Sequence, residues 1–249
     1  VLDAVTKQFH SGEGAIQFAP EAIARSNADI LKDDELRKEF IEIYSEQGKD
    51  EARNWINSSY GPFSEEELDH RMSRYGLNPC GEILGNDFHC NLAEVHLNQI
   101  DPGNFEEQKK AFKAAALSVA CLLNHEFEVE RYRKSREYDP IVGVSFTGLF
   151  DFCVHAFGTP WLKWWEAGRP NSEEGKTFKE KEAKFLDSWR KIVKETVWEY
   201  CDKHNLRRPN RCTTVQPAGS KTLLPGAAPG WHPPKAQRFI RRITFRTND

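Results

Sequence analysis

A nearly uninterrupted apolar run, IVGVSF, occupies residues 141–146. A strand with one face in water alternates apolar and polar residues, whereas a strand of a parallel sheet is buried on both faces and lacks that alternation. The run therefore predicts a parallel strand. Residues 91–97 (NLAEVHL) do alternate and predict a second strand, and residues 101–123 between the two predict a helix. Because strands and helices alternate, we predict an α/β fold with a mainly parallel sheet.

The helix predicted at 101–123 has both a start signal and an apolar face. Asn104 is followed three residues later by Glu107, the spacing of a capping pair. Its predicted buried residues are Phe112, Ala115, Ala116, Val119 and Leu122 or Leu123. Further predicted elements are strands at 14–18, 212–216 and 238–245, a long helix at 178–203, a loop at 166–176, and helices from 20 to 75 with a capping box at Ser64 and Glu67, ending by Gly76.

Composition excludes several classes of function. The chain has 249 residues, 39% of them hydrophobic and 29% charged, which is enough for a packed core. A net charge of -3 predicts no nucleic-acid partner, and the basic clusters at 207–211 and 238–242 are interpreted as solvated faces or strand edges. No apolar run is long enough for a membrane span, and the start does not resemble a signal peptide. Six cysteines are too few for a disulfide scaffold, so we expect reduced thiols in the cytoplasm.

Residues 78–98, NPCGEILGNDFHCNLAEVHLN, hold two cysteines and two histidines. A zinc site would use Cys80, Cys90, His89 and His96, but nine residues between the cysteines is not the usual ligand spacing, so no structural metal is expected. A purely structural role is the alternative for Cys80 and Cys90. We assign such a role to three further cysteines in helical or apolar contexts, Cys121, Cys153 and Cys201.

The neighbours of Cys80 favour a reactive thiol. Pro79 fixes φ and Gly81 permits unusual backbone angles, so a tight turn can direct Asn78, Cys80 and Glu82 at one small polar molecule. A carboxylate can act as general base on a bound hydroxyl, and an amide can hydrogen-bond a second one. This combination suits a sugar, with the thiol as the reacting atom.

A second candidate site follows the strand predicted at 212–216. Ala218, Gly219, Ser220, Lys221 and Thr222 lead into a possible helix start, where backbone N–H groups, two hydroxyls and a lysine could bind phosphate. The spacing does not fit a Walker A loop, and a plain Gly/Pro turn is the alternative. A sugar site and a phosphate site together predict a nucleotide substrate.

Four motifs, in this order, resemble the large catalytic chain of ribonucleotide reductase. They are NPCGE (78–82), similar to the family's finger-loop motif, CNLAEVHLN (90–98), PIVGVSFTGLFD (140–151) and VQPAGSKTLLPGAAPGWHP (215–233). Two features resemble the adenosylcobalamin-dependent branch of the family, and within it the triphosphate reductases. They are the residues of the motifs NPCGEI and QPAGS, and the short gap between Cys80 and Cys90.

The resemblance implies a ten-stranded α/β barrel of two halves with the finger loop through its centre. It also implies that Cys80 carries a thiyl radical that abstracts the ribose 3′ hydrogen. Glu82 would take the 3′-hydroxyl proton, and Asn78 would bind the ribose hydroxyls. Cys90 would be one of two thiols that reduce the 2′ position. Ala218, Gly219, Ser220, Lys221 and Thr222 would hold the phosphates, and a thioredoxin-type protein would be the reductant.

The chain also departs from the family. Its enzymes are several hundred residues longer, and both the cysteine partner of Cys90 and the C-terminal cysteine pair are absent here. We therefore expect residues 1–249 to be a single domain, the C-terminal half of the barrel with the finger loop around 76–90. It would need a complementing N-terminal reductase chain for activity. The alternative is a non-catalytic nucleotide-binding or interaction protein that keeps the scaffold.

Overall fold

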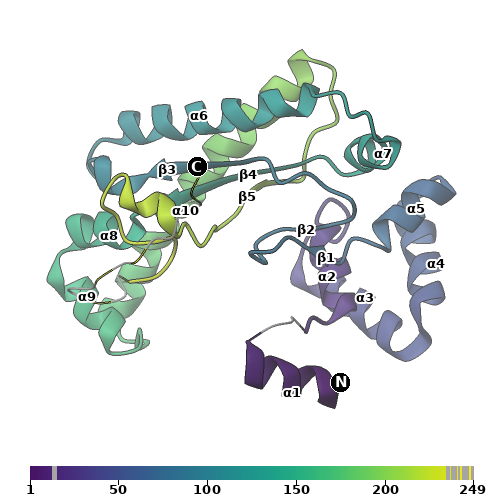
Figure 1. The fold of residues 1–249 in the computed structure, drawn as a ribbon, viewed down its shortest axis with the longest axis horizontal. Coiled ribbons are helices and arrows are strands. Elements are labelled where there is room, and N and C mark those ends of the chain that lie inside the picture. The colour runs from purple at the N-terminus through teal and green to yellow at the C-terminus, as the bar shows by residue number, and fades with distance from the viewer. Residues whose placement is uncertain (13–15, 234–235, 237–239, 241, 243–246, 248–249) are drawn as a thin grey trace. The chain divides into compact units, whose positions relative to one another are not determined.

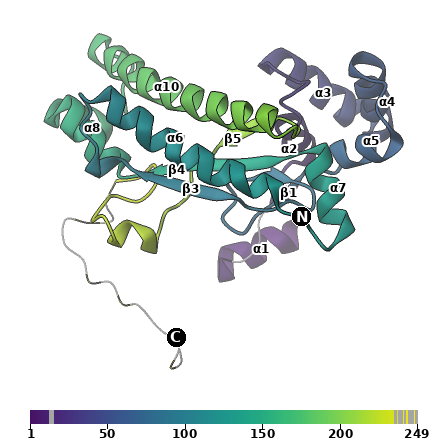
Figure 2. The same ribbon diagram turned by 90° about the horizontal axis from the view of Figure 1, so that it is seen from above.

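The structure is a computed structural model that describes residues 1–12, 16–233, 236, 240, 242 and 247 (Figures 1 and 2). Contacts between residues divide the chain into two compact units. The first consists of Val1–Asn91, Val119–Gly143 and Val197–Thr214, and the second of Leu92–Ser118, Val144–Thr196 and the described residues from Val215 on. Both units draw on segments far apart in the chain. The single domain expected over 1–249 stays a prediction.

The described strands form two small sheets. The antiparallel pair consists of β1 (Gly76–Leu77) and β2 (Leu84–Gly85), with Gly76 opposite Gly85. The parallel sheet has the order β3-β4-β5 and consists of β3 (Leu92–His96), β4 (Ile141–Thr147) and β5 (Arg211–Thr213). Every residue of β4 is buried, as the apolar run predicts. The α/β class and the parallel sheet are thereby confirmed, whereas the described residues form three parallel strands and not a ten-stranded barrel.

Short helices build the core of the first unit. They are α2 (Ala19–Ser26), α3 (Asp34–Gln47), α4 (Lys49–Tyr60) and α5 (Glu65–Arg71). Their buried apolar residues form one cluster that includes Ile23, Phe40, Ile56 and Leu68. Asp33 caps α3, and Ser64 caps α5 by accepting a hydrogen bond from the Glu67 amide at 3.1 Å. The unit also contains α1 (Leu2–Ser11), none of whose residues is buried, and α7 (Glu130–Tyr138).

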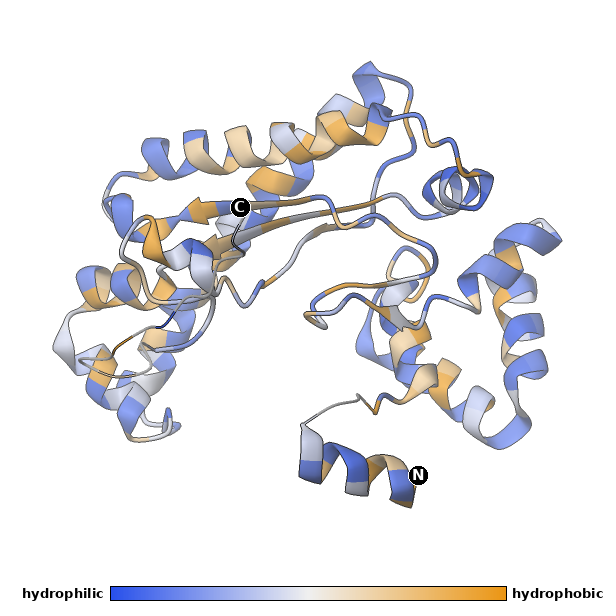
Figure 3. Ribbon diagram, viewed as in Figure 1, coloured by the Kyte–Doolittle hydropathy of each residue, from blue (hydrophilic) through white to orange (hydrophobic). Residues whose placement is uncertain are grey.

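Aromatic side chains build the core of the second unit. Phe112 of α6 (Phe105–Cys121) stacks on Trp189 of α10 (Glu173–Lys203) with ring centroids 5.0 Å apart, and Phe146 of β4 packs against the same indole. Figures 1 and 2 show α6 and α10 side by side, and the bands of polar and apolar residues along α6 in Figure 3 reflect its amphipathic sequence. The remaining helices of this unit are α8 (Leu149–Phe157) and α9 (Thr159–Glu166), with the 3₁₀ turns η1 (Leu97–Gln99) and η3 (Ser220–Leu223).

Most predicted elements are present, with changed limits. The helix at 101–123 is α6 followed by η2 (Leu122–Asn124). The Asn104 side chain caps it by accepting from the Glu107 amide at 3.1 Å, and Asn104 Nδ2 donates to the Glu107 carboxylate at 3.3 Å. The strand expected at 212–216 is the shorter β5, and α10 begins at Glu173, so the loop expected at 166–176 is shorter too. The strand predicted at 14–18 is wrong at 16–18, which carry no regular structure, and residues 14–15 lie outside the described residues. Most of 238–245 also lies outside them.

None of the helices in the described part of the chain combines the length and the apolar content that a membrane span needs.

Candidate active site

The finger loop, residues 76–90, is closed by short backbone contacts at its tip. The β1–β2 pair brings its two limbs together, and the Asn78 amide donates to the Ile83 carbonyl at 3.3 Å. Gly81 donates to the Asn78 carbonyl at 2.9 Å and has φ +73°, a region that glycine adopts without strain. The tight turn predicted around Pro79 and Gly81 is confirmed.

The Asn78 side chain connects the tip of the loop to Cys90. Its Oδ1 accepts a hydrogen bond from the Ile83 amide at 3.1 Å, and its Nδ2 donates to Cys90 Sγ at 3.6 Å. An amide nitrogen carries two protons, so Asn78 can donate a second hydrogen bond to a ligand. Two of the predicted site residues, twelve positions apart, therefore meet in one side-chain contact.

Cys80 lies at the exposed tip of the same loop. We expect a thiol that carries a radical to be shielded from solvent. The described residues do not shield it, because Cys80 is exposed. All six cysteines of the chain are thiols in this structure.

Glu82 has one buried, unsatisfied carboxylate oxygen, and it is also one of the residues that line a cavity. Its Oε2 is buried without a hydrogen-bond partner among the described residues. Glu82, Gly81, Leu77 and Thr214 line a cavity of about 300 Å³, a volume that suits a small polar ligand. Because a buried acceptor without a partner is costly, the position favours a ligand hydroxyl as the missing donor.

The second candidate site is a loop of the second unit. Ala218 is buried with φ +52°, and Thr222 is buried and donates its hydroxyl to the Gly219 carbonyl at 2.8 Å. Gly219, Ser220 and Lys221 are exposed. The helix start expected here is η3, a single 3₁₀ turn. Ala218 and Thr222 thus shape the loop, while the three residues between them face solvent.

Sequence reasoning missed two side chains that hold Lys221. Its Nζ donates to Gln216 Oε1 at 2.6 Å and forms an ion pair with Glu94 Oε1 at 3.0 Å. The Glu94 side chain is only 4% exposed, and both of its oxygens lack a partner in hydrogen-bond geometry among the described residues. The available signal was a glutamate inside a predicted strand, where this residue type is uncommon.

The two candidate sites belong to different units, Asn78, Cys80, Glu82 and Cys90 to the first and residues 218–222 to the second. Among the described residues no group of three or more histidine, cysteine, aspartate or glutamate side chains is placed to hold a metal. His89, considered above as a zinc ligand, lies against Phe127 with ring centroids 4.1 Å apart.

No family model matches the chain, but curated relatives do. An adenosylcobalamin-dependent ribonucleoside-triphosphate reductase from Lactobacillus gasseri is 31% identical over 180 residues, which is 70% of this chain and 24% of the relative. The enzyme of the same name from Levilactobacillus brevis is 31% identical over 185 residues, with the same shares. That from Lactobacillus acidophilus is 28% identical over 212 residues, which is 80% of this chain and 27% of the relative.

A solved structure of a B-12 dependent (class II) ribonucleotide reductase matches 64% of this chain and 23% of that chain, with 23% identity and a TM-score of 0.47.

By its curated relatives the chain is related to the ribonucleotide reductases, a class of oxidoreductases. Those relatives are, in particular, adenosylcobalamin-dependent ribonucleoside-triphosphate reductases, which confirms the resemblance carried by the four sequence motifs. The chain spans about a quarter of the length of these relatives.

The residues around the finger loop do not by themselves fit the cofactor in the relatives' name. The cavity beside Glu82 has about 300 Å³, the lower end of the range for small-molecule sites. Adenosylcobalamin, a corrin ring with two nucleoside-containing arms, is far larger than that. The cavity matches the size of a sugar.

Proposed function

We propose that the chain carries the finger loop and the phosphate loop of an adenosylcobalamin-dependent ribonucleoside-triphosphate reductase. In that role it takes part in converting ribonucleoside triphosphates to 2′-deoxyribonucleotides for DNA synthesis. The observation that carries the proposal is the loop in which Asn78 contacts Cys90 at 3.6 Å and Glu82 lines a sugar-sized cavity. The proposal takes adenosylcobalamin dependence from the relatives, and the cofactor, when bound by the complete enzyme, would supply the radical.

Each side chain of the loop has one role in the proposed reaction. Cys80, as a thiyl radical, removes the hydrogen atom from ribose C3′. Glu82 accepts the proton of the 3′-hydroxyl as a general base. Asn78 donates to a ribose hydroxyl with the second proton of its amide nitrogen.

Cys90 supplies half of the reducing equivalents. Two thiols deliver two electrons and two protons, the 2′-hydroxyl leaves as water, and the thiols join in a disulfide. On this proposal the second thiol lies outside the quarter of the relatives' length that this chain spans. A thioredoxin-type reductant then returns the disulfide to two thiols.

The phosphates are assigned to residues 218–222. The exposed Gly219, Ser220 and Lys221 contact them, and Ala218 and Thr222 maintain the shape of the loop. On this proposal residues 1–249 form the C-terminal half of a ten-stranded barrel, completed by an N-terminal reductase segment or chain. We place the protein in the cytoplasm, because its cysteines must stay reduced.

A chimera tests the proposal. The matched segment of the Lactobacillus gasseri reductase is replaced by the corresponding residues of this chain, and deoxyribonucleotide formation is measured with adenosylcobalamin and a dithiol. We expect turnover in the chimera and background turnover in its Cys80→Ser variant. The control is Cys121→Ser, which removes an exposed thiol of α6 and should leave turnover unchanged. A chimera that works equally well with Cys80→Ser would refute the assignment of Cys80.

A further inference from the structure

Residues 82–86 form the second limb of the finger loop, here called the outer limb. Among the described residues, one edge of this limb has no neighbouring strand. Successive carbonyls of extended backbone point to opposite sides. On the inner side, β2 pairs with β1, and the Ile83 carbonyl accepts from the Asn78 amide. The carbonyls of Glu82, Leu84 and Asn86 therefore share the opposite edge, where they need donors from elsewhere.

Three side chains from distant parts of the first unit supply these donors. Thr214 Oγ1 donates to the Glu82 carbonyl at 2.9 Å. Arg211 Nη1 donates to the Leu84 carbonyl, and Ser135 Oγ to the Asn86 carbonyl. The bonded carbonyls belong to every second residue, as in the hydrogen-bond ladder between two strands. Here side-chain donors take the place of the backbone N–H groups of a neighbouring strand.

The orientation of Arg211 is fixed by a buried carboxylate. Its Nη2 forms an ion pair with Asp139, whose side chain is 3% exposed, while Nη1 of the same guanidinium reaches Leu84. Arg74, which is fully buried, approaches the same oxygen of Asp139, with its Nε 3.4 Å from Oδ2. A planar guanidinium can donate to a carboxylate and to a carbonyl at once through its two terminal nitrogens.

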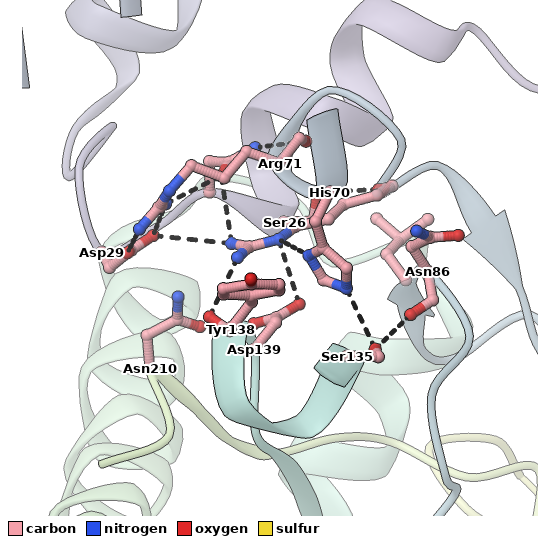
Figure 4. Close-up of polar contacts among 12 residues, drawn as sticks. Ser26, Asp29, His70, Arg71, Asn86, Ser135, Tyr138, Asp139 and Asn210 are labelled. Carbon is pink, nitrogen blue, oxygen red and sulfur yellow. Dashed lines mark hydrogen bonds and ion pairs between the residues drawn. The ribbon is translucent and has the colours of Figure 1, made fainter. Parts of the chain in front are cut away.

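The orientation of Ser135 is fixed by a buried histidine. Arg74 Nε donates to His70 Nδ1 at 3.2 Å, so the ring proton of neutral His70 is on Nε2. Nε2 lies 3.0 Å from Ser135 Oγ, and Figure 4 shows His70 directed at Ser135 and Ser135 at Asn86. Since Ser135 Oγ accepts a hydrogen bond from His70, its own hydroxyl proton is directed to the Asn86 carbonyl.

We propose that Thr214, Arg211 and Ser135 are positioning residues that hold the finger loop in the arrangement that brings Asn78, Glu82 and Cys90 together. The Ile83 amide is bonded to Asn78 Oδ1, so a shift of the outer limb moves Asn78 and its contact with Cys90. The consequence for catalysis rests on the proposed function, whereas the effect on loop geometry does not.

The experiment compares Thr214→Val with Thr214→Ser in the 249-residue chain. Valine keeps the shape of threonine but loses the donor, and serine keeps the donor. Amide hydrogen exchange is measured at Gly81 and Ile83, together with the rate of Cys90 alkylation. We expect Thr214→Val to raise both by about tenfold, the effect of one lost hydrogen bond, and Thr214→Ser to restore wild-type rates. Ser135→Ala should act in the same way.

Ser58→Ala is the matched control, because Ser58 donates to the Trp55 carbonyl on the exposed side of α4 and has no contact with the loop. It should leave both rates unchanged. Equal rates in wild type and Thr214→Val would overturn the proposal. Faster rates in Thr214→Val without any turnover in the chimera would support the positioning role and refute the proposed function. An active chimera whose kcat Thr214→Val leaves unchanged would refute the catalytic consequence.

Discussion

Glu94 and Lys221 are the residues whose observed contact most changes the expected phosphate site. The sequence suggests a lysine available to phosphate, but its ammonium lies 3.0 Å from Glu94 Oε1 and 2.6 Å from Gln216 Oε1. A triphosphate must compete with these partners for Lys221. On the proposed function, Glu94 therefore opposes phosphate binding by Lys221.

From this competition we predict that Glu94→Gln strengthens binding of a ribonucleoside triphosphate. Removing the carboxylate charge releases about 1 kcal/mol of ion-pair attraction, which corresponds to roughly fivefold tighter binding. Titration calorimetry with ATP measures the change. Glu106→Gln is the control, since Glu106 is an exposed carboxylate at the start of α6. Unchanged or weaker ATP affinity in Glu94→Gln would contradict the competition.

At the scale of elements, a buried polar network connects α5 to α7 and to the segment after it. His70 and Arg74 lie on or just after α5, Ser135 lies on α7, and Asp139 follows α7. Burial, and then the charge of Arg74, lowers the pKa of His70 to about 4, while Asp139 acts in the opposite direction. Burial also lowers the pKa of Arg74 to about 10, so its guanidinium is still charged at pH 7.

The lowered pKa of His70 predicts a specific pH dependence of stability. Unfolded histidine titrates near pH 6.5, so between pH 6.5 and 4 the unfolded state binds a proton that the native state does not. The contribution of His70 to the free energy of unfolding is therefore fully present above pH 6.5. It decreases as the pH falls towards 4, by up to about 3 kcal/mol. Urea denaturation at pH 7 and pH 5 should show a smaller loss in His70→Gln. His155→Gln, at an exposed position of α8, should behave as wild type.

Helices and strands that are indicated by a few neighbouring residues could be predicted from the sequence. Contacts with residues far away in the sequence could not. The capping pair of α6 and the apolar run of β4 are complete within a few residues, and both elements were predicted. Arg211 was interpreted as part of a solvated basic cluster, yet its side chain is 19% exposed and is bonded to Asp139 and Leu84. Nothing near residue 211 in sequence indicates a carboxylate 72 positions away.

In the candidate site, too, the local turn could be predicted from the sequence and the tertiary contacts could not. The turn of Asn78, Cys80 and Glu82 was predicted because Pro79 and Gly81 determine it locally. The contact between Asn78 and Cys90 and the three donors on the outer limb depend on tertiary structure, which a single sequence does not encode in its local pattern.

At the scale of the whole molecule, the reducing step requires a second thiol beside Cys90. Two of the remaining cysteines are unsuited to thiol–disulfide exchange, which requires a thiolate. Burial raises the pKa of the Cys153 thiol to about 12 and that of the Cys201 thiol to about 11. The chain also spans about a quarter of the length of its relatives. On the proposed function, we expect the second thiol to lie in the part of the reductase that this chain does not span.

We predict that the purified 249-residue chain alone forms no deoxyribonucleotide from ribonucleoside triphosphates, even with adenosylcobalamin and a dithiol. Adding an N-terminal segment of a relative that contains the first half of the barrel should restore turnover, because it supplies the missing thiol and covers the exposed Cys80. Chromatography of the nucleotides measures both conditions, and the same mixture with Cys90→Ser is the control for reduction through the Cys90 thiol. Turnover by the chain alone would show that the 249 residues contain the second thiol, and Cys212→Ser would then be the next variant to measure.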